Sequence, residues 1–282
     1  MKTKFLKIIS LVVITLISSI ALFSCTKLSA QKSITQTVWG NEETFTYKAQ
    51  YNQNDKQING ILTLSIKRIN KEDVQVGTLD VKGFIGTIFV YDLQMEDGSI
   101  VKSKSLIDSQ NKPIATYTEK NDKIHNSANT FLVNYIEKDK VAVINSNNES
   151  FEIKTGKYDK NFFLDNYSVF SILRSTNNSN LLSGFAFKSI NPTEKNLTSL
   201  FAKATLATDK SPIKTTDKIE AGYKDKNVVS VVSISLQQKT PPPGEAILLY
   251  IGESIKLENK TIVNPILQIK EGAMTYILDS AN

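Results

Sequence analysis

Two residue types with chemically reactive side chains, cysteine and histidine, each occur only once in this sequence. Cys25 is the only cysteine among the 282 residues, and His125 is the only histidine. A lone thiol can be alkylated or acylated, but it cannot form a disulfide within its own chain. A lone imidazole can serve a Ser-His-Asp triad or bind a metal only where suitable partners surround it. The residues near each one therefore determine the chemistry that it can do.

The residues before Cys25 have the pattern of an export signal. Three lysines lie within the first seven residues, and the sixteen residues 8–23 carry no charge. Such a run is typical of a signal peptide and is shorter than the roughly 20 residues of a membrane span. It ends in Leu22-Phe23-Ser24-Cys25, which resembles a lipobox, although Phe23 is bulkier than usual. An uncleaved membrane anchor with an incidental cysteine is the alternative.

The lipobox predicts a lipid-anchored protein. We expect residues 1–24 to be a signal peptide, cleaved between Ser24 and Cys25, with diacylglycerol and palmitate-type acyl chains on the cysteine. Acyl chains hold a protein to a membrane because each buried methylene contributes about 0.8 kcal/mol. The protein would then face outside the cytoplasm from a cell membrane or an outer membrane. Thr26 and Lys27 follow the cysteine, and they leave open whether the cell has one membrane or two.

The composition of the rest of the chain argues against nucleic acid as a partner. The formal net charge is +6, but three of the lysines lie in the signal, so the exported part is near +3. Its lysines alternate with acidic residues as they do on solvated turns. With 40% hydrophobic residues, the chain can build a core without disulfides.

Motifs for catalysis are missing from the sequence. His125 lies in the polar stretch Lys123-Ile124-His125-Asn126, and no Gly-x-Ser-x-Gly nucleophile motif occurs. The sequence also lacks the His and Cys pattern of zinc sites and the glycine-rich loops that bind phosphates. We therefore expect no enzyme, no cofactor and no metal site; a pair of carboxylates brought together by the fold is the remaining catalytic alternative.

Alternation of apolar and polar residues predicts a mainly β fold. After a tether at residues 25–38, residues 39–282 are expected to form one antiparallel β domain with a large curved sheet and one or two short helices. Asn59-Gly60, Asp97-Gly98 and Glu271-Gly272 are hairpin-turn candidates, and Gly83–Gly86 suggests a turn or bulge. The expected strands cover residues 45–51, 61–66, 74–81, 87–95, 99–107, 114–119, 130–136, 141–144, 150–155, 228–236, 246–251, 266–270 and 274–278.

Two segments depart from the alternation. Residues 165–174 predict a short helix with one apolar face, capped by Asp165 or Asn166. The second segment covers residues 192–207. There Asn191-Pro192-Thr193-Glu194 has the pattern of a helix start, yet the following residues also fit a strand. The local pattern slightly favours a helix in this second segment, and the question stays open.

The order of these elements resembles a family of uncharacterised bacterial envelope proteins, thought to share the half-barrel sheet of the Lol-type lipoprotein carriers. Its mid-chain Asp-x-Leu-Ser-x-x-Tyr-x-Leu-Arg helix is similar to residues 165–174, which end in Arg174. The first and last strand pairs, residues 43–64 and 265–278, are also similar. The resemblance implies a hairpin at 192–207 and a helix across the mouth of a curved sheet.

Such a sheet would have an apolar concavity, and the aromatic residues near the helix are its candidate lining. These aromatic candidates are Phe162, Phe163, Tyr167 and Phe170, and Leu173 is a further candidate for the lining. The alternative is that they fill the sheet as core. Two functions follow as hypotheses: a non-enzymatic lipoprotein that binds a lipid, another apolar ligand or an acylated partner, or a structural module that contacts another envelope protein. The oligomeric state stays open.

Overall fold

The structure is a computed structural model of the whole chain. It describes residues 39–53, 56–123, 126–135, 140–145, 149–155, 163–174, 182–206, 228–236 and 246–282. The predicted signal peptide and tether lie outside the described residues, as do Cys25, His125 and Phe162. The structure therefore leaves the predictions for these residues untested.

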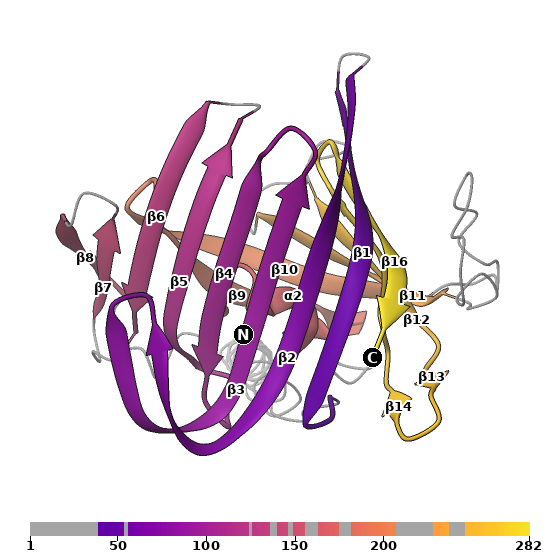
Figure 1. Cartoon of the computed structure of the whole chain (residues 1–282), viewed down its shortest axis with the longest axis horizontal. Helices are drawn as coiled ribbons and strands as arrows, with labels where there is room; N and C mark the ends of the chain where they lie inside the picture. Colours follow the sequence, from indigo (N-terminus) through magenta and orange to yellow (C-terminus); the bar gives the residue numbers. More distant parts are fainter. Residues whose placement is uncertain are drawn as a thin grey trace, which may run out of the picture.

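One large antiparallel sheet dominates the described part of the chain (Figure 1). It contains 14 strands in the order β8-β7-β6-β5-β4-β3-β2-β1-β16-β15-β12-β11-β10-β9, so β8 and β9 are its two edges. The mainly β fold with a curved, open sheet is thus confirmed. The strands are β1 (Glu42–Gln53), β2 (Lys56–Val76), β3 (Leu79–Met95), β4 (Ile100–Ile107), β5 (Pro113–Asp122), β6 (Ser127–Asn134), β7 (Lys140–Asn145), β8 (Ser150–Lys154), β9 (Phe185–Asn191), β10 (Asn196–Leu206), β11 (Val228–Leu236), β12 (Ile247–Gly252), β15 (Ile266–Glu271) and β16 (Met274–Ala281).

The curvature brings the two edges of the sheet toward each other. A cluster of buried side chains joins Val133 of β6 and Ile153 of β8 to Ile190 of β9. Phe163 belongs to the same cluster and forms an isolated bridge with Lys188 of β9. Burial of apolar surface on both edges therefore stabilises the curved shape without closing the hydrogen-bond ladder.

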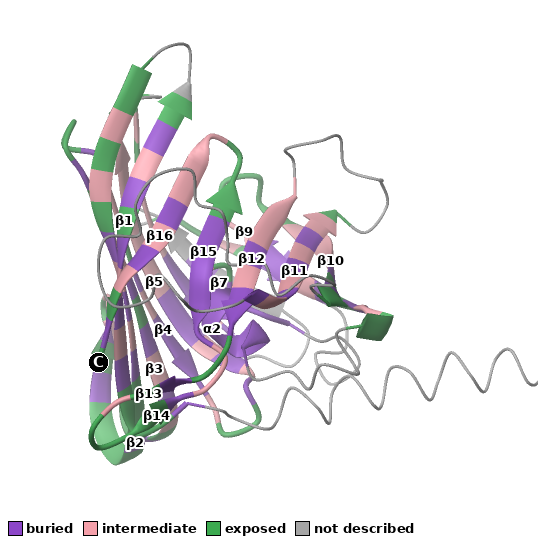
Figure 2. Cartoon of the chain, turned by 90° about the vertical axis from the view of Figure 1, so that its right-hand side faces the viewer, coloured by how far each residue is buried: buried purple, intermediate pink, exposed green. Residues whose placement is uncertain are grey.

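A short helix lies inside the curve. Helix α2 (Ser168–Leu173) has six residues, all of them buried. Figure 2 shows it between the wall formed by β1 to β5 and the wall that contains β15, β12, β11 and β10. The predicted helix is therefore confirmed, although it is shorter than residues 165–174. No helix among the described residues is long and apolar enough to cross a membrane.

The long β2–β3 hairpin curls over the convex face of the sheet (Figure 1). The Lys104 ammonium of β4 donates to the carbonyl of Gln75 at 2.8 Å. Gly77 lies so close to the Tyr117 ring of β5 that a Cβ at this position would be 2.5 Å from the ring. A second core cluster, which includes Val74, Val76 and Leu106, fills the space beneath the curl.

One turn prediction and one strand prediction in this hairpin region are wrong. Asn59-Gly60 lies within β2, paired with Gln50 and Ala49, because β1 continues to Gln53. Gly60 is required there by a close approach of β3: a Cβ would lie 2.5 Å from the carbonyl oxygen of Gln94. The stretch 74–81 is not one strand either, since Gly77, with φ of 57°, begins a tight turn that separates β2 from β3.

Other turns and segments follow the expectations. Asp97-Gly98 joins β3 to β4, Glu271-Gly272 joins β15 to β16, and the register of β2 shifts opposite the segment that includes Gly83. For residues 192–207, which the sequence left open, the structure has the β9–β10 hairpin, so the local helix pattern was misleading. Lys195 has a left-handed φ of 54° that ends the turn, and pairing with β11 then fixes β10 as a strand. The two-residue strands β13 (Ile255–Lys256) and β14 (Thr261–Ile262) were not predicted.

Candidate ligand site on the concave face

Strand register assigns the side chains of β3, β4 and β5 to the two faces of the sheet. Leu93, Val101 and Lys120 occupy directly opposed positions on these three strands. Because directly opposed side chains share a face and Leu93 belongs to the main core, Val101 and Lys120 also face inward. The next row, two residues along, contains Tyr91, Ser103 and Thr118. The inner wall thus changes from apolar on β3 to polar on β5.

Hydroxyl groups form a band along this inner wall. The Ser103 and Thr118 hydroxyls are 3.1 Å apart, and the Thr116 hydroxyl donates to the Ser105 hydroxyl at 3.3 Å. All four lie on β4 and β5. Buried hydroxyls need hydrogen-bond partners, and here each hydroxyl has another hydroxyl of the band as its partner. The band is a polar surface within a concavity that is otherwise mainly apolar.

Asp165 joins this band to helix α2. Its carboxylate accepts from the Ser105 hydroxyl at 2.7 Å, and from the backbone N–H groups of Tyr167 at 3.1 Å and Ser168 at 3.0 Å. A buried carboxylate is tolerated only with such donors. The neighbouring Asn166 side chain donates to the Ile190 carbonyl of β9 at 3.0 Å. The segment before the helix is therefore attached to both walls.

Arg174 fixes the other end of the helix. Its guanidinium pairs with Glu43 of β1 at 3.0 Å and donates to the carbonyls of Asn264 at 3.1 Å and Val263 at 2.9 Å. The guanidinium also lies over the Phe45 ring, 4.6 Å from its centroid. Such a set of donors and acceptors satisfies a buried ion pair. Helix α2 thus bridges the walls as a crossbar with polar contacts at both ends.

Three tyrosines meet beside the start of the helix. The Tyr91 hydroxyl donates to the Tyr276 hydroxyl at 3.3 Å, and the Tyr91 and Tyr167 ring centroids are 4.8 Å apart. Tyr91 and Tyr276 are buried, whereas Tyr167 is half-buried. Desolvation raises the pKa of each hydroxyl, and the nearby Glu271 carboxylate raises it further. All three hydroxyls are therefore neutral hydrogen-bonding groups at physiological pH.

Glu271 lies at the open end of the concave face. By alternation from buried Ile269 it faces inward at the end of β15. Its side chain is accessible to solvent, yet desolvation by the surrounding protein raises the pKa of its carboxyl, an effect that the Lys120 ammonium of β5 partly offsets. A side chain that solvent can reach, although protein atoms surround it on several sides, is typical of a concave surface.

We call the accessible inward-facing region around these groups the mouth. It comprises half-buried apolar side chains next to charged and phenolic ones. Lys120 forms an ion pair with Asp122 at 3.2 Å, and Met274 lies opposite Glu271 in the β15–β16 hairpin. The mouth is defined by Ile58, Val101, Lys120, Asp122, Tyr167, Glu271 and Met274.

The described residues predicted to line a cavity lie in two environments. Phe163, Phe170 and Leu173 are each no more than 3% exposed and belong to the core clusters. Tyr167 is the half-buried one, at the mouth. The space beneath helix α2 is therefore filled by side chains. The lining role predicted for these residues remains a prediction, and Tyr167 is the described member best placed for it.

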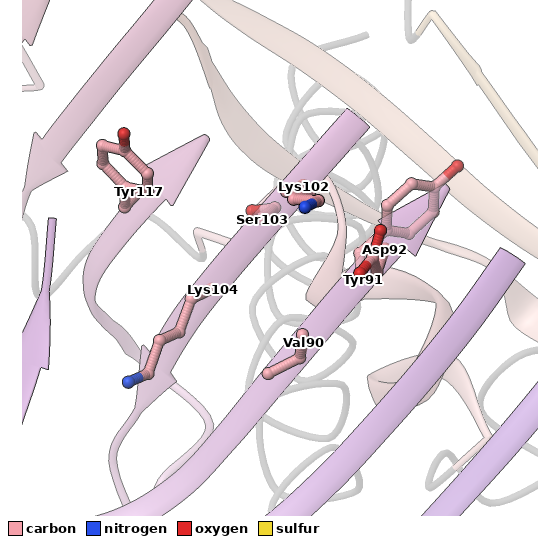
Figure 3. A pocket seen from close by; sticks show the side chains of 7 residues that line it. All are labelled: Val90, Tyr91, Asp92, Lys102, Ser103, Lys104 and Tyr117. Atoms are coloured by element: carbon pink, nitrogen blue, oxygen red, sulfur yellow. The ribbon is translucent and has the colours of Figure 1, made fainter. Parts of the chain in front are cut away.

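A pocket of about 140 Å³ lies on the opposite, convex face, between β3, β4 and β5 (Figure 3). Val90, Lys104 and Tyr117 form a cross-strand row in it. Its volume is below the roughly 300 Å³ at which ligand sites begin. We therefore place the candidate site on the concave face.

No protein-family model matches the chain, and no curated protein sequence matches it. One solved structure has a similar shape: a crystal structure of a β-barrel-like protein, of the domain of unknown function DUF1849, from Brucella abortus. Its TM-score is 0.47 and its sequence is 10% identical, over 86% of this chain and 97% of that one. This likeness carries no functional inference.

Sequence reasoning missed most of the mouth. Lys120 and Glu271 are ordinary charged residues near strand ends, and neither spacing nor type sets them apart. The hydroxyl band had a weak signal in Ser103-x-Ser105 and Thr116-x-Thr118, since residues two apart share a face of a strand. Only the register of β4 against β5 brings these pairs together.

Proposed function

We propose that this chain is a lipid-anchored, non-enzymatic protein of the cell envelope whose concave face binds an apolar ligand or an acylated partner at the mouth. One observation carries the proposal: side chains of both walls remain accessible at the mouth, while the space beneath helix α2 is filled. Half-buried apolar residues there, such as Val101 and Met274, bury further surface when an acyl chain covers them, which favours binding. The crossbar holds the walls apart, so the mouth is formed before binding.

The lipobox-like sequence around Cys25 supports the anchor and the location outside the cytoplasm. A protein held at a membrane surface by acyl chains meets lipids and acylated proteins at high local concentration. A modest affinity at the mouth would then suffice for occupancy. The absence of catalytic motifs in the sequence favours binding over catalysis.

A structural or interaction module of the envelope is the second candidate. The filled core beneath helix α2 favours it, because Phe163, Phe170 and Leu173 leave no room there for a ligand. In that case the accessible side chains of the mouth contact a protein surface and no small molecule binds.

Ligand extraction distinguishes the two candidates. The full chain is purified from membranes of a bacterial host, and bound small molecules are extracted and measured by mass spectrometry. We expect an apolar compound in stoichiometric amounts with the native chain, and its loss in Met274→Trp, which fills the mouth. The matched control is Ile61→Trp, at a position that is 55% exposed on the convex face. Equal lipid from all three proteins would reject binding at the mouth and favour the interaction module.

A further inference from the structure

The charges at the mouth do not balance. Of its three charged residues, Lys120 and Asp122 form an ion pair at 3.2 Å, so their charges compensate each other. Glu271 forms no ion pair with any described residue. The Lys120 ammonium that faces it is already engaged with Asp122. Among the described residues, the inward-facing groups of the mouth therefore include one carboxylate without an ion-pair partner.

An uncompensated carboxylate among protein walls is unfavourable, because desolvation penalises its charged form. Glu271 is also accessible, so a ligand can reach it. A bound cation would restore the missing electrostatic stabilisation, whereas a bound anion would add repulsion. The carboxylate thus selects among ligands by the sign of their charge.

Tyr167 adds a second feature that favours a cation. Its ring is half-buried beside the mouth, tilted by 46° against the buried Tyr91 ring. The face of a tyrosine ring attracts ammonium groups, most strongly where water is partly excluded. The carboxylate and the ring belong to different elements, β15 and the turn before α2, and the crossbar holds them together.

Apolar side chains extend this charged position into the concavity. Val101 of β4 and Met274 of β16 are half-buried, and Ile58 of β2 lies in the same cross-strand row as Met274, with Tyr51 of β1 between them. All three pack against the main core. Each buries more surface when a hydrocarbon chain lies on it.

We propose that the mouth binds a cationic or zwitterionic amphiphile, with its ammonium group against Glu271 and Tyr167 and its hydrocarbon chain against Val101 and Met274. This inference rests on the proposed function and adds the charge of the head group. The ammonium can come from a simple alkylammonium compound or from a phospholipid head group in which a phosphate accompanies it.

Short-chain probes test the proposal. The full chain is held in polymer-bounded membrane discs, and binding is measured by ligand-observed NMR with empty discs as the blank. The probes are octyltrimethylammonium, octyl glucoside and octyl sulfate, each below its micellar concentration. We expect the dissociation constant of the ammonium probe to be about fivefold to tenfold lower than that of the glucoside, the size of a partly exposed ion pair, and octyl sulfate to bind most weakly.

Variants at Glu271 and a matched site separate the head-group effect from the chain effect. Glu271→Gln should remove the preference for the ammonium probe, so that octyltrimethylammonium and octyl glucoside bind the variant with similar dissociation constants. The control Glu72→Gln changes an exposed acid of the β2–β3 hairpin and should keep the preference. A preference that survives Glu271→Gln, or tighter binding of octyl sulfate, would overturn the inference.

The outcomes also keep the inference distinct from the proposed function. If all three probes bind equally and Met274→Trp abolishes this binding, the proposed function stands and the charge preference is wrong. If no probe binds, both are rejected. Octylphosphocholine distinguishes the sources: affinity equal to that of octyltrimethylammonium indicates a phospholipid head group, and clearly weaker binding indicates a simple alkylammonium compound.

Discussion

Arg174 and Glu43 form an ion pair at 3.0 Å in which each side chain is only 1% exposed, although 131 residues separate them in the sequence. The pair fixes the end of helix α2 to the first strand of the sheet. Further acceptors for the guanidinium come from the loop before β15. Three segments far apart in the chain therefore meet at one buried charge.

Removal of one partner of this pair should destabilise the fold strongly. Arg174→Met leaves Glu43 buried without a counter-charge, which costs about 3–5 kcal/mol of unfolding free energy. Urea denaturation measures this loss. The double variant Arg174→Met/Glu43→Met should lose less stability than the sum of the losses in the two single variants, because it leaves no buried charge without a partner. The solvent-accessible pair Lys48–Asp279, at 3.2 Å, is the control, and Lys48→Met should lower the free energy of unfolding by less than about 1 kcal/mol. Equal effects at both pairs would contradict the structural role of Arg174.

Replacement of Asp165 should detach the start of the helix. Asp165→Ala leaves the Ser105 hydroxyl and the N–H of Ser168 without their acceptor, and each orphaned buried group costs about 1–3 kcal/mol. We expect lower stability in urea and faster hydrogen exchange at the amides of Tyr167 and Ser168. Ser105→Ala removes one donor but leaves the Asp165 carboxylate its two N–H partners. This variant should therefore lose less stability than Asp165→Ala. A larger loss in Ser105→Ala would show that the hydroxyl band, and not Asp165, carries the stability.

The sequence predicted the type of most elements because alternation is a local property. Val228–Leu236, for example, is predicted and observed with the same bounds. The helix ends were also visible, since Asp165 and Arg174 stand out as polar residues that flank an apolar run. The partners of these two residues were not visible. Glu43 and Ser105 are unremarkable in sequence, and only the long-range register of the sheet brings them to the helix.

Glycine positions show the same limit. In Asn59-Gly60 a turn dipeptide occurs inside a strand, because Gly60 is needed for the approach of β3 rather than for a turn. Gly77, without a turn dipeptide, begins the real turn. The sequence does not show whether a glycine serves a close tertiary approach, as Gly60 does, or a left-handed backbone in a turn, as Gly98 does. The mouth was unpredictable for a related reason: Lys120 and Glu271 meet only through the curvature of the sheet.

Gly60→Ala should therefore destabilise the protein although the backbone there is ordinary strand. The added Cβ would lie 2.5 Å from the carbonyl oxygen of Gln94 and from the Met95 sulfur. Neighbouring atoms must shift to remove this overlap, which should lower the free energy of unfolding by about 1–3 kcal/mol. The midpoint of urea denaturation measures the change. Gly40→Ala is the control, since no atom lies within 4 Å of its added Cβ. If the two variants are equally stable, the close approach of β3 at Gly60 is wrong.

Cys25→Ser should abolish the predicted lipid anchor. The serine hydroxyl cannot form the thioether that carries diacylglycerol, so the variant should stay at the mass of the unprocessed chain. Metabolic labelling with palmitate and partition into detergent measure the change: the native chain should be labelled and the variant unlabelled. Ser171→Ala, a core change within helix α2, should leave the label unaffected. Equal labelling of Cys25→Ser would mean that the lipobox interpretation is incorrect.

Glu271 should make stability depend on pH in the acidic range. Its pKa in the folded chain is raised by desolvation, so the folded protein binds this proton more tightly than the unfolded chain does. The resulting stabilisation is present below the unfolded pKa and is lost as the pH rises through the folded pKa. The groups that interact with this carboxyl are the Lys120 ammonium and the hydroxyls of Tyr91, Tyr167 and Tyr276, which stay neutral.

Glu271→Gln removes this titration and tests its sign. At pH 4 the native carboxyl is largely protonated and resembles the amide, so the melting temperatures of the two proteins should be nearly equal. As the pH rises toward 7 the native carboxyl loses its proton, and desolvation penalises the ionised form, so the variant should melt at the higher temperature there. Glu72→Gln, at an exposed position, should show no such trend. A native protein that is more stable than Glu271→Gln at pH 7 would mean that a cationic partner within the chain already compensates this carboxylate, and the mouth would then have no uncompensated charge to offer a ligand.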